Sequence, residues 1–295
     1  LACSAAISAC NGDGGHQWAA VLQLLAGART SFLRPDIYVY GAAIDVCQKA
    51  GQGEAGLELL TEAHNSDLQL TAVACNAAIG ACGNGSRWEA AVRLLDWMWA
   101  QGPPPGVITY NAAISACENG RQWQHALALL PEMQRARIRP DAITCNSMIS
   151  ACEKGHQWEW ALACKAEMAT LHLRPNVITY NATISAGEKG PLGQWRRAES
   201  LLMEMAGERL RPDAITLNAT IGACGRGLAW ERALAWLAGM RRRALQPDEI
   251  TFSAAISACA WRWQAALRLL AEMRALAPGP RAAACSAAAG ACSRG

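Results

Sequence analysis

The chain repeats itself about every 35 residues. The dipeptide Pro-Asp or Pro-Asn recurs along it, as at Pro140-Asp141, and each copy is followed by a phrase similar to Thr144-Cys145-Asn146. A fixed period of this length indicates a stack of similar supersecondary units rather than one closed hydrophobic core. The period therefore predicts a repeat protein, and the residues that vary within its constant frame are the ones that carry specificity.

The unit at 107–141 shows what each repeat folds into. Its first half places apolar residues at i, i+3, i+4 and i+7, which is one face of a helix. Its second half carries another apolar stripe at helical spacing, from Trp123 to Met133. We expect Gly120 to end the first helix in a left-handed conformation, and Pro140 to force an extended turn. Each unit is thus predicted to be a hairpin of two helices, in an all-α, helix-turn-helix solenoid that buries both stripes by stacking.

The repeat frame predicts a single array over residues 1–295, with seven complete units and two partial ones. The unit at 249–281 is two residues short between Cys259 and Trp263, so its inter-helix turn must be tight. The unit at 37–71 has Gly53 where most units have Trp, and it should pack least well. The predicted units are 1–36 (partial), 37–71, 72–106, 107–141, 142–176, 177–213, 214–248, 249–281 and 282–295 (partial).

Tryptophan, methionine and cysteine recur at fixed positions, and we interpret all three as core residues. Cysteines seven residues apart lie two turns apart on one helix, roughly 10 Å along its axis, which is too far for a disulfide. No CxxC pair is present, so zinc spacing is missing and we predict no metal or cofactor. We expect the thiols to be small buried groups at tight helix contacts. The commonest cysteine position holds Cys10, Cys47, Cys82, Cys117, Cys152, Cys224, Cys259 and Cys292.

Composition excludes several function classes. No apolar run approaches the ~18 residues of a membrane span, so no membrane insertion is expected. The net charge of +3 permits an anionic partner without demanding one. The five histidines are scattered and show no HxE pattern with a CxxC, and no nucleophile or paired-acid motif is present. The chain is therefore predicted not to be an enzyme.

The segments ITYNAAISACENG and EMQRARIRPD resemble the pentatricopeptide repeat family, in its 35-residue P-type form, over essentially the whole chain. The tetratricopeptide repeat is the rival family, but its Trp signature lies in the first helix, whereas Trp123 opens the second. The Trp itself is unusual, because an aliphatic residue often stands there in the pentatricopeptide pattern. The resemblance implies a right-handed superhelix that binds single-stranded RNA in a mitochondrion or chloroplast, with one base per repeat. Any targeting segment is expected outside these residues.

The resemblance also assigns roles to positions. The fifth residue of each first helix and the last residue of the unit are implied to recognise one base, and the second residue to sandwich it. The pairs imply a U/C-rich target of about 5′-GNNUCUU-3′. The implied base-reading residues are Ser4, Asp36, Asn76, Asn111, Asp141, Asn146, Asn176, Asn181, Asp213, Asn218, Asp248 and Ser253, the base-sandwiching residues are Ile108, Ile143, Ile178, Ile215 and Ile250, and the phosphate-contacting residues are Lys49, Lys154, Lys189 and Arg226.

Each assignment has a structural alternative. An Asp directly before a helix is an expected N-cap, and a cation at a helix C-terminus is favoured by the helix dipole. The pairs Gly41/Thr71 and Asn76/Gly106 depart from the family's pairing rules, so two adjacent bases would be left unread. A non-catalytic scaffold in an organellar ribosomal or membrane complex is therefore the alternative to an RNA-binding protein.

Overall fold

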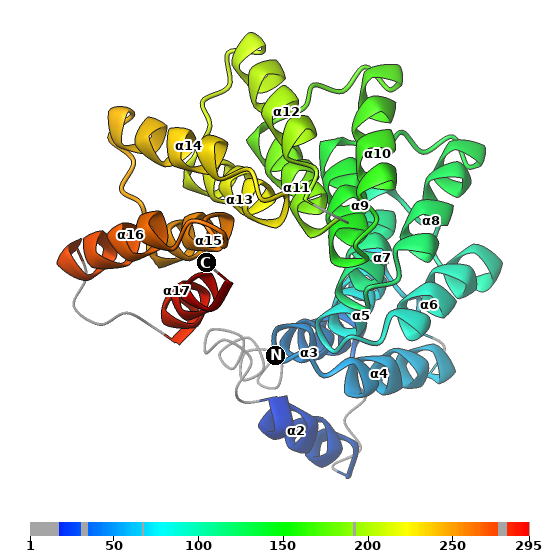
Figure 1. The fold of residues 1–295 in the computed structure, drawn as a ribbon. Helices are drawn as coiled ribbons and strands as arrows, with labels where there is room; N and C mark the ends of the chain where they lie inside the picture. Colours follow the sequence, from blue (N-terminus) through cyan, green and yellow to red (C-terminus); the bar gives the residue numbers. More distant parts are fainter. Residues whose placement is uncertain (1–17, 31–34, 67, 191–192, 277–281, 295) are drawn as a thin grey trace. The chain divides into compact units, whose positions relative to one another are not determined.

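The computed structural model describes residues 18–30, 35–66, 68–190, 193–276 and 282–294, and these ranges fold into sixteen α-helices without a strand. The chain divides into two compact units, 1–151 and 152–295. The helices of each unit follow one another as hairpins, and we call the first helix of a hairpin its A helix and the second its B helix (Figure 1). The predicted all-α helical-repeat solenoid is thus confirmed.

The first unit begins with α2 (Trp18–Thr30), the B helix of the first partial repeat, followed by three complete hairpins. In this unit each A helix packs against its own B helix, and α3 and α5 also pack against the next A helix. The hairpins are α3 (Ile37–Lys49) with α4 (Gly53–Asn65), α5 (Ala72–Asn84) with α6 (Trp88–Gln101), and α7 (Val107–Asn119) with α8 (Trp123–Arg135). The division between the units falls within the next A helix, α9 (Ala142–Lys154).

The second unit has the same arrangement. The B helices α12, α14 and α16 lie along one side of the A helices α11, α13 and α15 (Figure 1). α15 has 10 residues, whereas the other complete A helices have 13, because its repeat is the shortened one. The helices are α10 (Trp158–Thr170), α11 (Val177–Lys189), α12 (Trp195–Gly207), α13 (Ala214–Arg226), α14 (Trp230–Arg242), α15 (Glu249–Ala258), α16 (Trp263–Leu276) and α17 (Ala282–Arg294).

Methionine and cysteine are core residues, as predicted. The six repeat methionines from Met98 to Met273 are at most 4% exposed. Burial raises the pKa of the Cys82 and Cys117 thiols to about 11, so both remain protonated at neutral pH. The cysteines of the commonest position are buried and free at Cys47, Cys82, Cys117, Cys152, Cys224 and Cys259, whereas Cys10 and Cys292 lie outside the residues whose side chains are described. In the described part of the chain no helix has the length and apolarity to cross a bilayer.

The predicted left-handed conformation of Gly120 is wrong. Gly120 has φ −76°, and the left-handed residue is the next one, Arg121, with φ 56°. Arg121 takes this conformation because the turn after α7 closes with a hydrogen bond from the Gln122 N–H to the Cys117 carbonyl. The glycine instead allows the indole of Trp88, in the preceding repeat, to approach the backbone closely. A Cβ at Gly120 would lie 2.5 Å from Cδ1 of that indole.

Two of the repeat tryptophans, Trp88 and Trp158, are wedges between consecutive hairpins, as predicted, but they are only half-buried, and Trp263 is exposed. The ring of Trp88 contacts Gly120 and packs at a 45° tilt against His125, the third residue of the next B helix, with ring centroids 4.5 Å apart. In the second unit a Cβ at Gly190 would lie 2.8 Å from Trp158, and the guanidinium of Arg197 lies 4.7 Å from that ring. A small residue and a flat side chain from the next repeat therefore cover each of these two indoles.

We expect Gly120→Ala to destabilise the chain by about 1–3 kcal/mol, because the new methyl group overpacks the contact with Trp88. Urea unfolding followed by circular dichroism measures this effect. Gly207→Ala is the matched control, since a Cβ there meets nothing within 4 Å. Adding Trp88→Leu should make Gly120→Ala nearly neutral. If Gly120→Ala lowers the free energy of unfolding by the same amount in the Trp88→Leu variant, the contact with the indole is not the reason for the glycine.

Candidate functional site

Three side chains from two consecutive repeats meet where one A helix lies beside the start of the next. Asn111 on α7 donates from Nδ2 to both carboxylate oxygens of Asp141, at 3.2 and 3.4 Å. The Thr144 hydroxyl lies 2.6 Å from Asn111 Oδ1 and 3.0 Å from Asp141 Oδ1. Asp141 also caps α9, because its Oδ1 accepts from the Thr144 N–H at 2.8 Å. We call this Asn, Asp and Thr arrangement a triad.

The second unit contains two more triads with nearly the same dimensions. The distance from the asparagine Oδ1 to the threonine hydroxyl is 2.5 Å in one and 2.6 Å in the other. The aspartates cap α13 and α15 by accepting from the Thr216 and Thr251 N–H groups, at 2.8 Å in both cases. The members are Asn181, Asp213 and Thr216 in one triad and Asn218, Asp248 and Thr251 in the other.

The threonine determines which way the asparagine amide points. The Thr144 hydroxyl accepts from the Asp141 N–H at 3.2 Å, and its single proton is shared between Asn111 Oδ1 at 2.6 Å and Asp141 Oδ1 at 3.0 Å. The amide oxygen is thus bound by the hydroxyl, and the amide nitrogen faces the carboxylate. One N–H of Asn111, a donor, therefore lies next to the outer lone pairs of Asp141, which are acceptors. Sequence analysis missed this threonine, although its recurrence three residues after each Asp was a visible signal.

The carboxylates of two triads, Asp141 and Asp213, are held in the ionised form. For Asp141, burial alone would raise the pKa, but hydrogen bonds from the Thr144 N–H, the Thr144 hydroxyl and Asn111 outweigh it and lower the pKa below its ordinary value. The pKa of Asp213 is lowered in the same way by Thr216 and Asn181 against the effect of burial. Each of these carboxylates therefore accepts hydrogen bonds and donates none at neutral pH.

A row of large apolar side chains faces solvent beside these groups. The second residue of each A helix lies two residues after the capping residue, so Ile143 is close to Asp141 and its N–H also bonds that carboxylate. Single exposed apolar residues are ordinary, but here the same position is exposed from repeat to repeat. The predicted sandwiching residues are between 61% and 70% exposed at Ile108, Ile143, Ile178, Ile215 and Ile250.

The first unit also contains an incomplete triad. Asn76 has no carboxylate opposite it, because Gly106 stands where Asp stands elsewhere. Its buried Oδ1 has no hydrogen-bond partner in the described residues, and the Thr109 hydroxyl bonds only the Gly106 N–H, at 3.1 Å. At Gly41 the asparagine itself is missing, and a Cβ there would meet nothing within 4 Å. The two repeats that depart from the pairing rules thus differ from the others by missing side chains and keep the same helices.

The remaining predicted base-reading residues lie at helix starts or in first turns. Asp36 caps α3 by accepting from the Val39 N–H at 2.9 Å, and Asn176 caps α11 by accepting from the Thr179 N–H at 3.0 Å. Asn146 and Ser253 are the fifth residues of α9 and α15 and are half-buried. Ser4 lies outside the described residues. At both positions the last residue of the unit is therefore an N-cap of the following A helix.

The predicted phosphate-contacting cations are the last residues of their A helices, at Lys49, Lys154, Lys189 and Arg226. Lys49 pairs with Asp45 at 3.5 Å, and Lys189 pairs with Glu153 at 2.9 Å. Burial raises the pKa of Glu188, and the charge of Arg226 opposes that rise. An arriving anion would therefore compete with carboxylates of the protein itself, which weakens this part of the predicted site.

Family models match the middle of the chain. The PPR repeat family matches residues 105–154 and 140–187, and the pentatricopeptide repeat domain matches residues 58–119. Residues 58–187 therefore consist of pentatricopeptide repeats. A search of curated protein sequences finds no match.

Solved structures share this pentatricopeptide repeat fold. PPR10 in complex with an 18-nt psaJ RNA element matches with a TM-score of 0.78 and 18% identity, over 92% of this chain and 39% of that one. PPR10 from maize matches with a TM-score of 0.62 and 20% identity, over 97% and 46%. The PPR domain of Arabidopsis thaliana protein-only RNase P 1 in complex with tRNA matches with a TM-score of 0.51 and 15% identity, over 59% and 90%. This chain therefore spans less than half the length of the PPR10 chain.

We expect Asp213→Ala to lower the free energy of unfolding at pH 7 by about 1 kcal/mol, through loss of the α13 cap. The pKa of Asp213 is depressed in the folded state, so its stabilisation is present above pH ~4 and is lost as the pH falls through the lower folded pKa. In urea unfolding, the difference in the free energy of unfolding between wild type and Asp213→Ala should therefore be smaller at pH 2 than at pH 7. The control is Asp96→Ala on the exposed side of α6. A difference that persists unchanged at pH 2 would contradict a role for the ionised carboxylate.

Proposed function

We propose that the chain is a non-catalytic protein that binds single-stranded RNA, with one base per repeat and a preference for about 5′-GNNUCUU-3′. The observation that carries this proposal is the recurrence of the triad beside an exposed isoleucine. Three copies present the same donor and acceptor at the same repeat position, next to an apolar surface. A structural cap needs the Asp alone, whereas the oriented amide and the exposed Ile are unnecessary for capping.

The free groups of the triad complement uracil. The ionised carboxylate of Asp213 requires an N–H donor, and the imino N3–H of uracil is one. The neighbouring N–H of Asn181 can then donate to a uracil carbonyl oxygen. Cytosine places the N3 lone pair at that position, where it would face a carboxylate without a proton between them. An unsatisfied pair of this kind costs about 1–3 kcal/mol, enough for a tenfold preference.

The isoleucines offer a face for the base. Ile178 and Ile215 belong to consecutive A helices and are both more than 60% exposed. A base held between two such side chains would bury apolar surface on both faces, in the way that stacking platforms bind single strands. The cations at the ends of the A helices would contribute a binding component that weakens with salt.

The comparisons support an RNA partner, since two of the similar structures are pentatricopeptide repeat proteins in complex with RNA. On the family resemblance we further propose that the chain acts in RNA processing, stabilisation or translation in a mitochondrion or chloroplast. Fractionation of the native cell with an antibody to the chain tests the location, and crosslinking followed by sequencing of the bound RNA identifies the target.

The preference itself is tested by fluorescence anisotropy with a labelled 12-nucleotide RNA that contains GAAUCUU. We expect binding at least tenfold tighter than to a scrambled RNA of the same composition. Asn181→Ala should abolish the choice of U over C at the sixth base and leave the choice at the fourth and seventh bases intact. Equal affinity for both RNAs would overturn sequence preference. A loss that spreads over all bases would overturn the assignment of one base to one repeat.

The incomplete triad provides a gain-of-function test. Gly106 has φ −121° and ψ −174°, the extended conformation that the capping aspartates adopt, and a Cβ there meets open space. Gly106→Asp should pair with Asn76 and Thr109, and it should create a preference of about tenfold for U over C at the third base. Gly106→Ala is the matched control, because it adds the Cβ without the carboxylate. A variant that folds, binds RNA and gains no preference would contradict the triad as the recognition element.

A further inference from the structure

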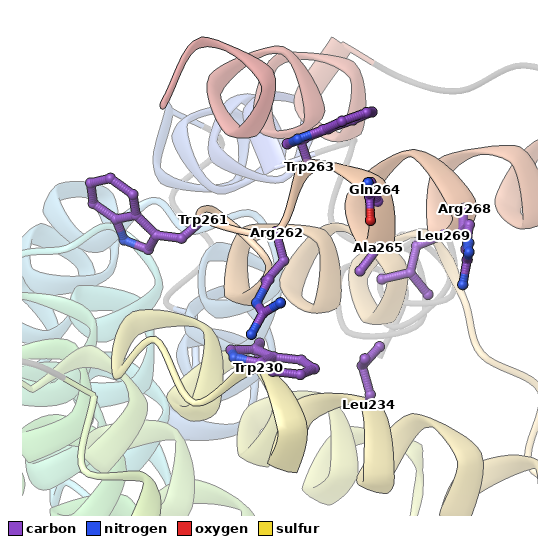
Figure 2. Close-up of a pocket in the computed structure, with 9 residues that line it drawn as sticks. All are labelled: Trp230, Leu234, Trp261, Arg262, Trp263, Gln264, Ala265, Arg268 and Leu269. Carbon is purple, nitrogen blue, oxygen red and sulfur yellow. The ribbon is translucent and has the colours of Figure 1, made fainter. Parts of the chain in front are cut away.

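A pocket of about 530 Å³ opens between α14 and α16 in the second unit. Figure 2 shows the guanidinium of Arg262 directed at the indole of Trp230, and Leu234 on α14 facing Ala265 and Leu269 on α16. The pocket lies at the end of α15 that is remote from Thr251. The 10 residues of that helix separate it from the nearest triad by roughly 15 Å along the axis.

The pocket exists because the repeat at 249–281 is irregular. In two other repeats a glycine at the end of an A helix covers the preceding Trp, and the third residue of the B helix packs against it. Here the two missing residues remove the segment that contains that glycine, and the third residue of α16 is Ala265. The Arg262 guanidinium lies over Trp230 instead, 4.8 Å from the centre of the ring. The space normally filled by a neighbouring repeat is left open.

The chemistry of the pocket is apolar inside and cationic at the edge. Its walls are Leu234, Ala265 and Leu269, and its edge carries Arg262 and Arg268. No ion pair joins either arginine to an acidic residue in the described ranges, and none of the described lining residues is acidic. Two further indoles are exposed there, Trp261 at 60% and Trp263 at 42%. This combination favours a ligand that joins a bulky apolar group to negative charge.

We propose that this pocket binds a segment of a partner protein that inserts a large apolar side chain against Trp230, with flanking Asp or Glu carboxylates on Arg262 and Arg268. Tryptophan and arginine are the residues that most often dominate protein interfaces. A nucleobase fits less well, because its polar edge would lose water against the aliphatic walls of Leu234, Ala265 and Leu269, which offer no hydrogen bonds in return. The site is independent of RNA binding at the triads.

The pocket can be closed by introducing the side chain that another repeat already has at the same position. Ala265→His restores the side chain that packs against the preceding Trp in the repeat of α8, so the variant should fold as well as wild type. Arg268→Glu reverses the charge of the pocket edge at an exposed position and changes nothing inside. Arg274→Glu is its control, since Arg274 is exposed on the same helix and does not line the pocket.

The test is panning of a random 12-residue peptide library displayed on phage against the full chain, with the Ala265→His chain as the counter-target. We expect enriched peptides that combine Leu, Ile, Phe, Met or Trp with several acidic residues. Their affinity, measured by anisotropy of the labelled synthetic peptide, should fall at least tenfold with Ala265→His and with Arg268→Glu and should stay unchanged with Arg274→Glu.

Three results would overturn the proposal. The first is no enrichment over the closed variant, and the second is enrichment of peptides without acidic residues. The third is competition from RNA: a U₁₂ oligonucleotide that displaces the peptide, and whose own affinity falls with Ala265→His, would make the pocket a nucleic-acid site. Because the triads are intact in every variant, binding of GAAUCUU RNA reports separately on the proposed RNA function.

Discussion

The distance between consecutive A helices is the constraint on which the rest of this structure depends. Neither helix of a hairpin can bury its apolar stripe alone, so each hairpin must stack on the next. The stacking faces are lined by Ala, Cys and Gly, and the approach is so close that a Cβ at Gly225 would lie 2.9 Å from the Ala254 carbonyl oxygen. Such small residues let the helix backbones approach, and the approach then determines which side chains of neighbouring repeats meet.

The triad is a direct product of that approach. Asn181 belongs to one repeat, whereas Asp213 and Thr216 begin the next A helix, and they reach hydrogen-bond distance only because the two helices are in close register. The aspartate consequently has two roles that sequence analysis treated as alternatives. One oxygen caps the helix, and the carboxylate also contacts the asparagine, so the cap holds the carboxylate in place for the base recognition that we propose. Capping thus preorganises the acceptor, which removes part of the entropy cost of binding.

Sequence periodicity predicted the helical hairpins and the buried methionines and cysteines, because each depends on spacing within one repeat. Periodicity did not predict the contacts between side chains of neighbouring repeats. The role of Gly120 is set by an indole 32 residues earlier, which local turn rules do not include. The link from Thr216 to Asn181 and the unpaired Asn76 Oδ1 were likewise invisible, since they depend on the distance between two helices. The shortened turn before Trp263 was visible, but the pocket that it opens over Trp230 was not.

Departures from the repeat have opposite consequences at the two ends of an A helix. At its N-terminal end a missing side chain, as at Gly106, removes recognition groups and leaves the stack intact, because the cap side chain contributes little to the apolar contacts. At its C-terminal end a missing segment, as before Trp263, uncovers a large aromatic surface, because the turn belongs to the packing between repeats. Under the RNA-binding function that we propose, loss of a polar group would therefore make a repeat unselective, whereas loss of a packing segment exposes surface that a new ligand could bury. A repeat protein can in this way lose specificity for one partner and gain a site for another without any change in its helices.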